Sequence, residues 1–157
     1  MIEGSALDRY FEMEEMLVEF SSLFSRKEPN ERAIAVIAGA FFDTLLMHML
    51  RNFLPEDTKE VDELLSHSGP LGTYGARIKM TYALGLIDRL VKQDLKMIGK
   101  IRNKFAHELN ISFDDPIISN WCKELKVHRL IFMPPPETPT SRQLFYVGCQ
   151  KLIGHLY

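Results

Sequence analysis

The sequence lacks the features that define several classes of protein. Its 157 residues include 2 cysteines, Cys122 and Cys149, which lie far apart and form no CxxC pair. Neither a disulfide scaffold nor a zinc site is indicated, and free thiols in a reducing cytoplasm are the expected state. With 9 glycines and 8 prolines, the chain is not collagen-like or of low complexity. The formal net charge of −2 gives the surface as a whole no general attraction for nucleic acid.

We also expect neither a signal peptide nor a membrane-spanning helix. The opening MIEGSALDRYFEMEE is acidic and has no apolar core, so we expect no signal peptide. Residues 33–50 are apolar and about long enough to span a bilayer, but Asp43 near their middle would cost about 3 kcal/mol there. We therefore expect a buried core helix in a cytoplasmic protein that has no membrane partner.

What the sequence does contain is helical periodicity, with apolar residues at steps of three and four. This pattern predicts an all-α fold: a single domain over 1–157, built as a bundle of six or seven helices. The expected helices are 6–25, 31–53, 58–66, one from Ala76, 89–108, a short one from Pro116, and 141–157. Expected caps are Asn30, Asp88, and either Asp114 or Asp115. Residues 127–140, with their PPPETPT run, predict an irregular connection in which VHRLIFM is a strand or an extended segment.

Charge is unevenly distributed along this chain. Residues 1–31 carry a net charge of −5, whereas residues 89–108 carry +4. The acidic first helix and the basic helix therefore offer complementary surfaces for self-association or for a protein partner.

The densest group of chemically useful side chains is Arg102, Asn103 and His107, in the basic helix. Asn103 and His107 are four residues apart and share a helix face, and the long side chain of Arg102 could reach the same groove. Arginine binds phosphate and histidine moves protons near neutral pH, so the set suits phosphate chemistry. A polar end of a surface helix contains the same residue types, and this simpler interpretation is the stronger of the two.

Two further charges lie in apolar surroundings. Asp43 requires a partner, which could be Arg102, His107 or Arg77, or it could be satisfied locally at the edge of the helix. Arg77 is better interpreted as a structural anchor than as a ligand contact. The other histidines show no HxxxH or HExxH spacing, and we expect neither a metal nor a cofactor.

Sequence motifs for nucleotides, serine hydrolysis and DNA reading are weak or missing. No GxGxxG, GxxxxGK[ST] or GxSxG occurs. The segment TYALGLIDRLVKQDLKMIGKIR places a glycine between two helical stretches, as a helix-turn-helix does, but its second helix carries a wide apolar stripe that needs burial. Direct, sequence-specific DNA binding is therefore not favoured.

Two blocks of the sequence resemble the mannitol operon repressor family of bacteria. They are GPLGTYGARIKMTYALGLI at 69–87 and IRNKFAHELNISFDDPIISNWCKEL at 101–125, and the likeness covers about 30–125. The resemblance implies an all-helical, non-enzymatic negative regulator of transcription that acts through contacts with proteins, as a homodimer or with another partner. It does not imply that mannitol genes are the target.

The RNKFAH segment is also similar to the Rx4–6H motif of HEPN domains, which are helical and usually dimeric. This similarity implies an up-and-down helical core and, as the alternative function, a metal-independent ribonuclease or an inactive RNA-binding relative. Under it, Arg102 and His107 would be the catalytic pair and Asn103 the polar residue beside them. The candidate binding residues are thus Asp43, Arg77, Arg102, Asn103 and His107.

Overall fold

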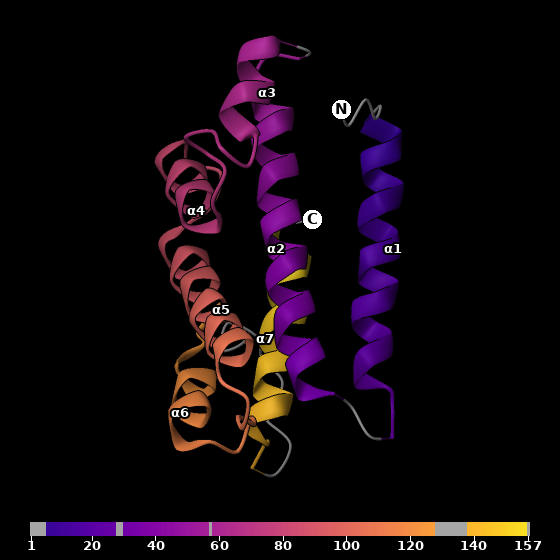
Figure 1. Ribbon diagram of the computed structural model, residues 1–157, viewed down its shortest axis with the longest axis vertical. Coiled ribbons are helices and arrows are strands. Elements are labelled where there is room, and N and C mark those ends of the chain that lie inside the picture. The colour runs from indigo at the N-terminus through magenta and orange to yellow at the C-terminus, as the bar shows by residue number, and fades with distance from the viewer. Residues whose placement is uncertain (1–5, 28–29, 57, 128–137, 157) are drawn as a thin grey trace.

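The chain folds into a bundle of α-helices, as a computed structural model shows (Figure 1). The structure describes residues 6–27, 30–56, 58–127 and 138–156. Within these ranges every regular element is a helix, so the predicted all-α fold is confirmed. The helices are α1 (Ala6–Phe24), α2 (Glu31–Phe53), α3 (Lys59–Leu65), α4 (Tyr74–Ala83), α5 (Arg89–His107), α6 (Pro116–Glu124) and α7 (Ser141–Leu156).

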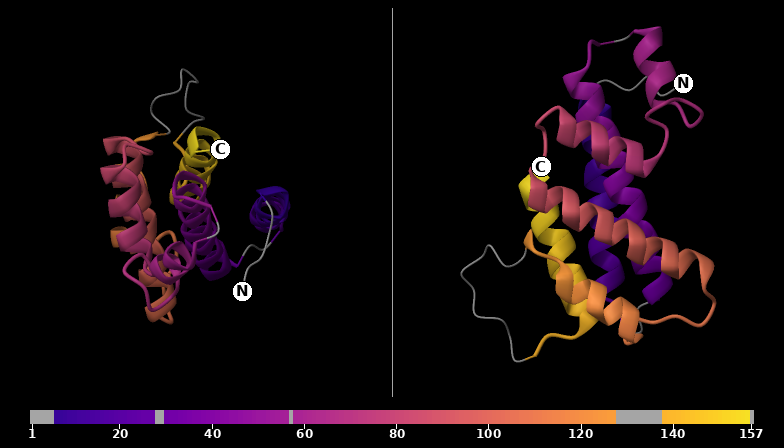
Figure 2. Two further views of the ribbon diagram at one scale, coloured as in Figure 1. Left: turned by 90° about the horizontal axis from the view of Figure 1, so that it is seen from above. Right: turned by 90° about the vertical axis from the view of Figure 1, so that its left-hand side faces the viewer.

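Helix α2 lies at the centre of three layers. Seen from above, α1 stands on one side of α2 and α7, and α4, α5 and α6 stand on the other (Figure 2, left). Helices α1, α4 and α5 all pack directly on α2. The helix can lie in this central position because it is apolar on most sides, and Ile34, Phe42 and Leu46 are fully buried.

The helix boundaries follow local capping chemistry. Asn30 accepts a hydrogen bond from the Ala33 N–H, and Asp88 accepts one from the Val91 N–H, as predicted. Asp115, rather than Asp114, caps α6 ahead of Pro116. Helix α4 begins two residues before the predicted Ala76, because Thr73, in the glycine-rich segment ahead of it, provides the N-cap.

The core is continuous from α1 to α7. Six phenylalanines among the described residues are fully buried, and the rings of Phe105, Phe113 and Phe145 follow one another at centroid distances of 4.9 and 5.2 Å. A smaller apolar cluster joins the end of α2 to α3 and the loop that follows. The α4–α5 turn contains Gly85, whose φ of 73° is a left-handed conformation that glycine adopts readily. The predicted VHRLIFM strand lies almost entirely outside the described residues.

Helix α2 is also the one described helix that is long and apolar enough to cross a membrane. More than half of that apolar stretch is buried inside the fold, and α2 carries Asp43 and His48. These features match the core helix that is predicted from the sequence.

Candidate functional site

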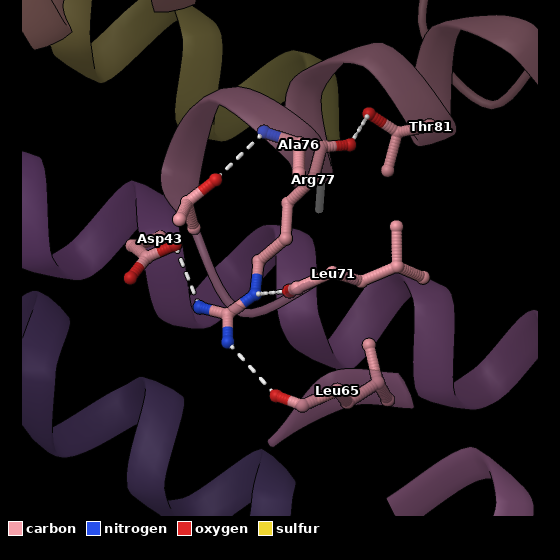
Figure 3. A network of polar contacts seen from close by, with 7 residues as sticks. Asp43, Leu65, Leu71, Ala76, Arg77 and Thr81 are labelled. Atoms are coloured by element: carbon pink, nitrogen blue, oxygen red, sulfur yellow. Dashed lines mark hydrogen bonds and ion pairs between the residues drawn. The ribbon is translucent and has the colours of Figure 1, made fainter. Parts of the chain in front are cut away.

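Arg77 forms a polar network where α2, α3 and α4 meet (Figure 3). Its Nη1 donates to Asp43 Oδ1 at 2.7 Å, its Nε to the Leu71 carbonyl at 2.9 Å, and its Nη2 to the Leu65 carbonyl at 3.2 Å. The Arg77 side chain is 8% exposed, whereas that of Asp43 is 35% exposed. Arg77 therefore joins α4 to α2, to the end of α3 and to the loop between α3 and α4.

This network selects one of the partners that the sequence left open for Asp43. Asp43 pairs with Arg77 across the α2–α4 contact, and the carboxylate remains partly in water. A buried guanidinium that keeps three acceptors is satisfied, so this arrangement fits an anchor between helices.

Arg102 is a second, half-buried charge near this junction. Its aliphatic stem packs on Gly39 of α2, where an added Cβ would come within 2.5 Å of Arg102 Cγ. Its guanidinium lies over the ring of Tyr74 on α4, 5.9 Å from the ring centroid. Arg102 Nε is buried and has no hydrogen-bond partner among the described residues. Arg102 is thus held by packing on α2 and α4.

Tyr74, whose ring contacts the Arg102 guanidinium, is itself fixed by a hydrogen bond. The Tyr74 hydroxyl donates to the Leu95 carbonyl at 2.8 Å and so connects α4 to α5. Burial raises the pKa of Tyr74 well above its ordinary value, and this effect outweighs the charge of Arg102, which acts in the opposite direction. Tyr74 therefore stays a neutral hydrogen-bond donor through the physiological pH range.

Asn103 and His107 lie on the outer side of α5, and both are exposed. At 100° per residue, Arg102 and His107 are about 140° apart around the helix. The structure turns Arg102 towards α2 and α4 and leaves Asn103 and His107 facing away from them. Within one chain, the five candidate residues therefore form an inner group of Asp43, Arg77 and Arg102 and an outer pair.

The outer side of α5 carries a continuous row of basic residues, which we call the basic stripe. Its members are Arg89, Lys92, Lys96 and Lys100, and Asn103 and His107 continue the row towards the end of the helix. Two of the lysines rest on aromatic rings: Lys92 Nζ lies 3.6 Å from the centroid of Tyr82, and Lys100 Nζ lies 5.1 Å from that of Trp121. These contacts hold the charges at the surface of α5.

Two residues have structural roles that were not predicted from the sequence. Arg32 at the start of α2 donates to the carbonyls of Phe105, Glu108 and Leu109 and so caps the C-terminus of α5. Buried Asp94 accepts hydrogen bonds from the backbone N–H groups of Lys126 and Val127. Arg32 is more than 70 residues away from its acceptors, so no local signal could reveal it. An acidic residue on the apolar side of α5 was a usable signal for Asp94.

The described part of the chain shows neither a cluster of metal-binding side chains nor a reactive cysteine. No cluster of three or more histidine, cysteine, aspartate or glutamate side chains that could hold a metal ion occurs in those ranges. Cys122 and Cys149 are free and buried. Burial raises the pKa of Cys122 to about 12 and that of Cys149 well above its ordinary value, so neither thiol is poised as a nucleophile.

A family model described as "Mannitol repressor" matches residues 34–151 of the chain. The match runs from the first turn of α2 into α7 and includes both groups of candidate residues. The chain belongs to the mannitol repressor family. The resemblance noted from the two sequence blocks is therefore confirmed, and α1 lies outside the matched residues.

Similar proteins agree with this assignment. The chain is 32% identical over 94 residues to the mannitol operon repressor of Escherichia coli strain K12, which aligns 58% of this chain and 47% of the relative. The alignment thus spans about half the length of that curated relative. Among solved structures, the MtlR–HPr complex from Escherichia coli matches with a TM-score of 0.67 at 20% identity, covering 90% of this chain and 95% of the other. A possible transcriptional regulator, YggD, from Shigella flexneri matches with a TM-score of 0.65 at 14% identity, covering 99% and 97%. At these identities the structural matches show a shared helical fold.

Proposed function

We propose that this protein is a non-enzymatic regulator of bacterial transcription that represses its target genes through contact with another protein. The observation that carries the proposal is the family match, which covers residues 34–151 and therefore most of the core. Regulation is the described role of the curated relative and of the YggD neighbour. We place the protein in the cytoplasm and propose that its helices act as one domain.

Protein contact is favoured over direct reading of DNA for two reasons. The structural neighbour from Escherichia coli was solved in complex with HPr, so a protein of this fold does bind another protein. The net charge of −2 gives the present chain no general attraction for a polyanion. HPr is accordingly the first partner to test, and the identity of the sugar alcohol, if any, follows from the target genes.

The arrangement of the candidate residues supports a non-enzymatic role. Under the HEPN similarity Arg102 and His107 would act as a catalytic pair, but within one chain they lie on different sides of α5, so a single copy brings no such pair together. None of the relatives named above is described as a nuclease. The inner group instead joins helices, as the hydrogen bonds of Arg77 illustrate.

The proposal is tested in two arms. Transcript levels are compared between a strain that lacks the gene and the same strain complemented with it, and we expect a small set of transcripts to fall on complementation. In the second arm, purified protein is titrated with HPr by calorimetry and, separately, with the upstream DNA of those genes over a series of salt concentrations. We expect saturable binding to the protein partner and only weak, salt-sensitive binding to DNA. Unchanged transcripts, or tight sequence-specific binding to the DNA by the protein alone, would contradict the proposal.

A further inference from the structure

Helix α1 carries an acidic counterpart of the basic stripe. Asp8, Glu12, Glu15 and Glu19 recur at steps of three and four along α1, and all four are exposed. We call this row the acidic stripe. Phe11 and Val18, on the adjoining strip of the same helix surface, are 56% and 68% exposed. An acidic row beside exposed apolar side chains is the composition of a surface that another protein covers.

The two stripes match in length and in charge. Each contains four charged residues and extends over eleven residue steps, from Asp8 to Glu19 on α1 and from Arg89 to Lys100 on α5. At 1.5 Å per residue, each row is about 16 Å long. The whole helices, each of 19 residues, carry net charges of −4 and +5. The spacing allows carboxylates of one row to lie opposite cations of the other when two helices are laid side by side. Glu12 also lies 3.5 Å from His48 Nε2 of its own chain, so the pairing rests mainly on Glu15 and Glu19.

The stripes of one molecule cannot pair with each other. Helices α1 and α5 lie on opposite sides of α2, and the views from the front and from above agree on this (Figures 1 and 2). Each copy therefore presents an acidic surface on one side and a basic surface on the other. A contact between α1 of one copy and α5 of another leaves one free stripe at each end, so it is heterologous and can continue to further copies.

We propose that copies of this protein associate head to tail, with the acidic stripe of α1 seated on the basic stripe of α5 of the next copy. A second copy is the occupant that satisfies both surfaces, because it neutralises the basic stripe and also covers Phe11 and Val18. The aromatic rings of Tyr82 and Trp121 beneath the lysines supply an apolar component on the α5 side. A nucleic acid would engage α5 alone and leave the apolar strip of α1 in water.

This association is independent of the proposed regulatory function, and sedimentation velocity of the full chain tests it. At low salt, roughly 50 mM, we expect the average sedimentation coefficient to rise with protein concentration beyond that of one fixed oligomer. At roughly 500 mM the rise should largely disappear, because the Debye length shortens to a few ångströms and exposed charges are screened. A coefficient that does not change with concentration at either salt overturns the proposal.

Two charge-reversed variants make the test specific. The first, Glu15→Lys with Glu19→Lys, reverses the acidic stripe, and the second, Lys96→Glu with Lys100→Glu, reverses the basic stripe. Each variant alone then opposes like charges, and we expect its self-association to weaken by about tenfold or more. An equimolar mixture should associate again, because each reversed stripe finds its complement on the other variant. Restoration by mixing also shows that both variants are folded.

A charge-matched control uses α3, which lies outside both stripes. Glu60→Lys with Glu63→Lys changes the net charge by the same amount as the first variant, at exposed positions. We expect this control to associate like the unmodified protein. If the control weakens association equally, or if the mixture fails to associate, the pairing of the stripes is wrong. If the unmodified protein stays at one size and the second variant instead loses binding to DNA or to another protein, the basic stripe has a different occupant and the proposal fails.

Discussion

The charged residues inside the bundle and those on the outer side of α5 are of the same chemical types, yet their surroundings give them different roles. Arg77 is fixed by three hydrogen bonds from one buried guanidinium, and Arg102 is fixed by packing against Gly39 and Tyr74. Lys96 and His107 on the outer side are exposed, where water and salt reduce the strength of any single ion pair. The difference teaches that charged residues of one helix can lie in very different surroundings within one chain. Stability should respond to the inner charges, and recognition should respond to the outer ones.

The largest expected effect is that of Arg77→Met. Methionine keeps much of the apolar volume but removes the cation from Asp43 and leaves the Leu65 and Leu71 carbonyls without their donor. Breaking a buried, hydrogen-bonded ion pair typically costs about 3–5 kcal/mol, and the partial exposure of Asp43 places the expected loss at about 3 kcal/mol. Urea unfolding measures the free energy of unfolding. Lys79→Met, at an exposed position of the same helix, is the control and should change it by less than about 0.5 kcal/mol.

Much of the fold was accessible from the sequence because helix boundaries are set locally. Asn30, Asp88 and Pro116 mark where helices begin. Asn30 and Asp88 each accept a hydrogen bond from the backbone N–H three residues later, and Pro116 occupies the first turn of its helix. The bounds predicted for α2 match the structure for the same reason. Helix α4 was placed two residues late, since Thr73 follows a glycine-rich loop and its capping role depends on the loop geometry.

The candidate site was less accessible, because its contacts join residues far apart in the chain. Asp43 pairs with Arg77 only because α4 packs against α2. Arg32 caps α5 through carbonyls that lie more than 70 residues later in the chain. The separation of Arg102 from His107 could have been read from 100° per residue. The length of the arginine side chain does not change the direction in which it leaves the helix.

Gly39→Ala should have the next largest effect, since it adds a methyl group where α2 and α5 meet. The new Cβ would lie 2.5 Å from Arg102 Cγ, so the arginine stem or the helices must shift. Overpacking of this kind typically costs about 1–3 kcal/mol, which outweighs the gain of less than about 1 kcal/mol from replacing a helical glycine.

The comparison with Gly75→Ala gives this prediction its sign. Gly75 is also helical, in α4, and an added Cβ there meets nothing within 4 Å. This variant should therefore be stabilised by up to about 1 kcal/mol through helix propensity alone. Thermal melts of the two variants should shift in opposite directions. A shift of the same sign in both would mean that Arg102 moves aside without cost.

The buried thiols should give an effect that is absent at neutral pH and grows as the pH rises. Burial raises the pKa of Cys122 to about 12 in the folded protein, whereas an unfolded cysteine titrates near 8.5. Above about pH 9 the unfolded chain releases protons that the folded chain retains, so the free energy of unfolding falls as pH rises. One thiol contributes about 1.4 kcal/mol for each pH unit in this window. Cys122→Ala should reduce the slope between about pH 9 and 11, and in the native protein a thiol reagent at pH 8 should react with Cys122 only after unfolding.

The smallest expected effect is that of His107→Ala, and it tests the outer side of the comparison directly. His107 is exposed at the end of α5, so its removal should change the free energy of unfolding by less than about 0.5 kcal/mol. Arg102→Ala, five residues earlier, removes a stem packed on Gly39 and a cation over Tyr74, and it should destabilise the protein by more than the histidine substitution does. Incubation of the same proteins with RNA separates stability from activity. If the unmodified protein cleaves RNA and His107→Ala abolishes cleavage without lowering the melting temperature, the two sides of α5 do cooperate in catalysis, and the division between structural and recognition charges is wrong.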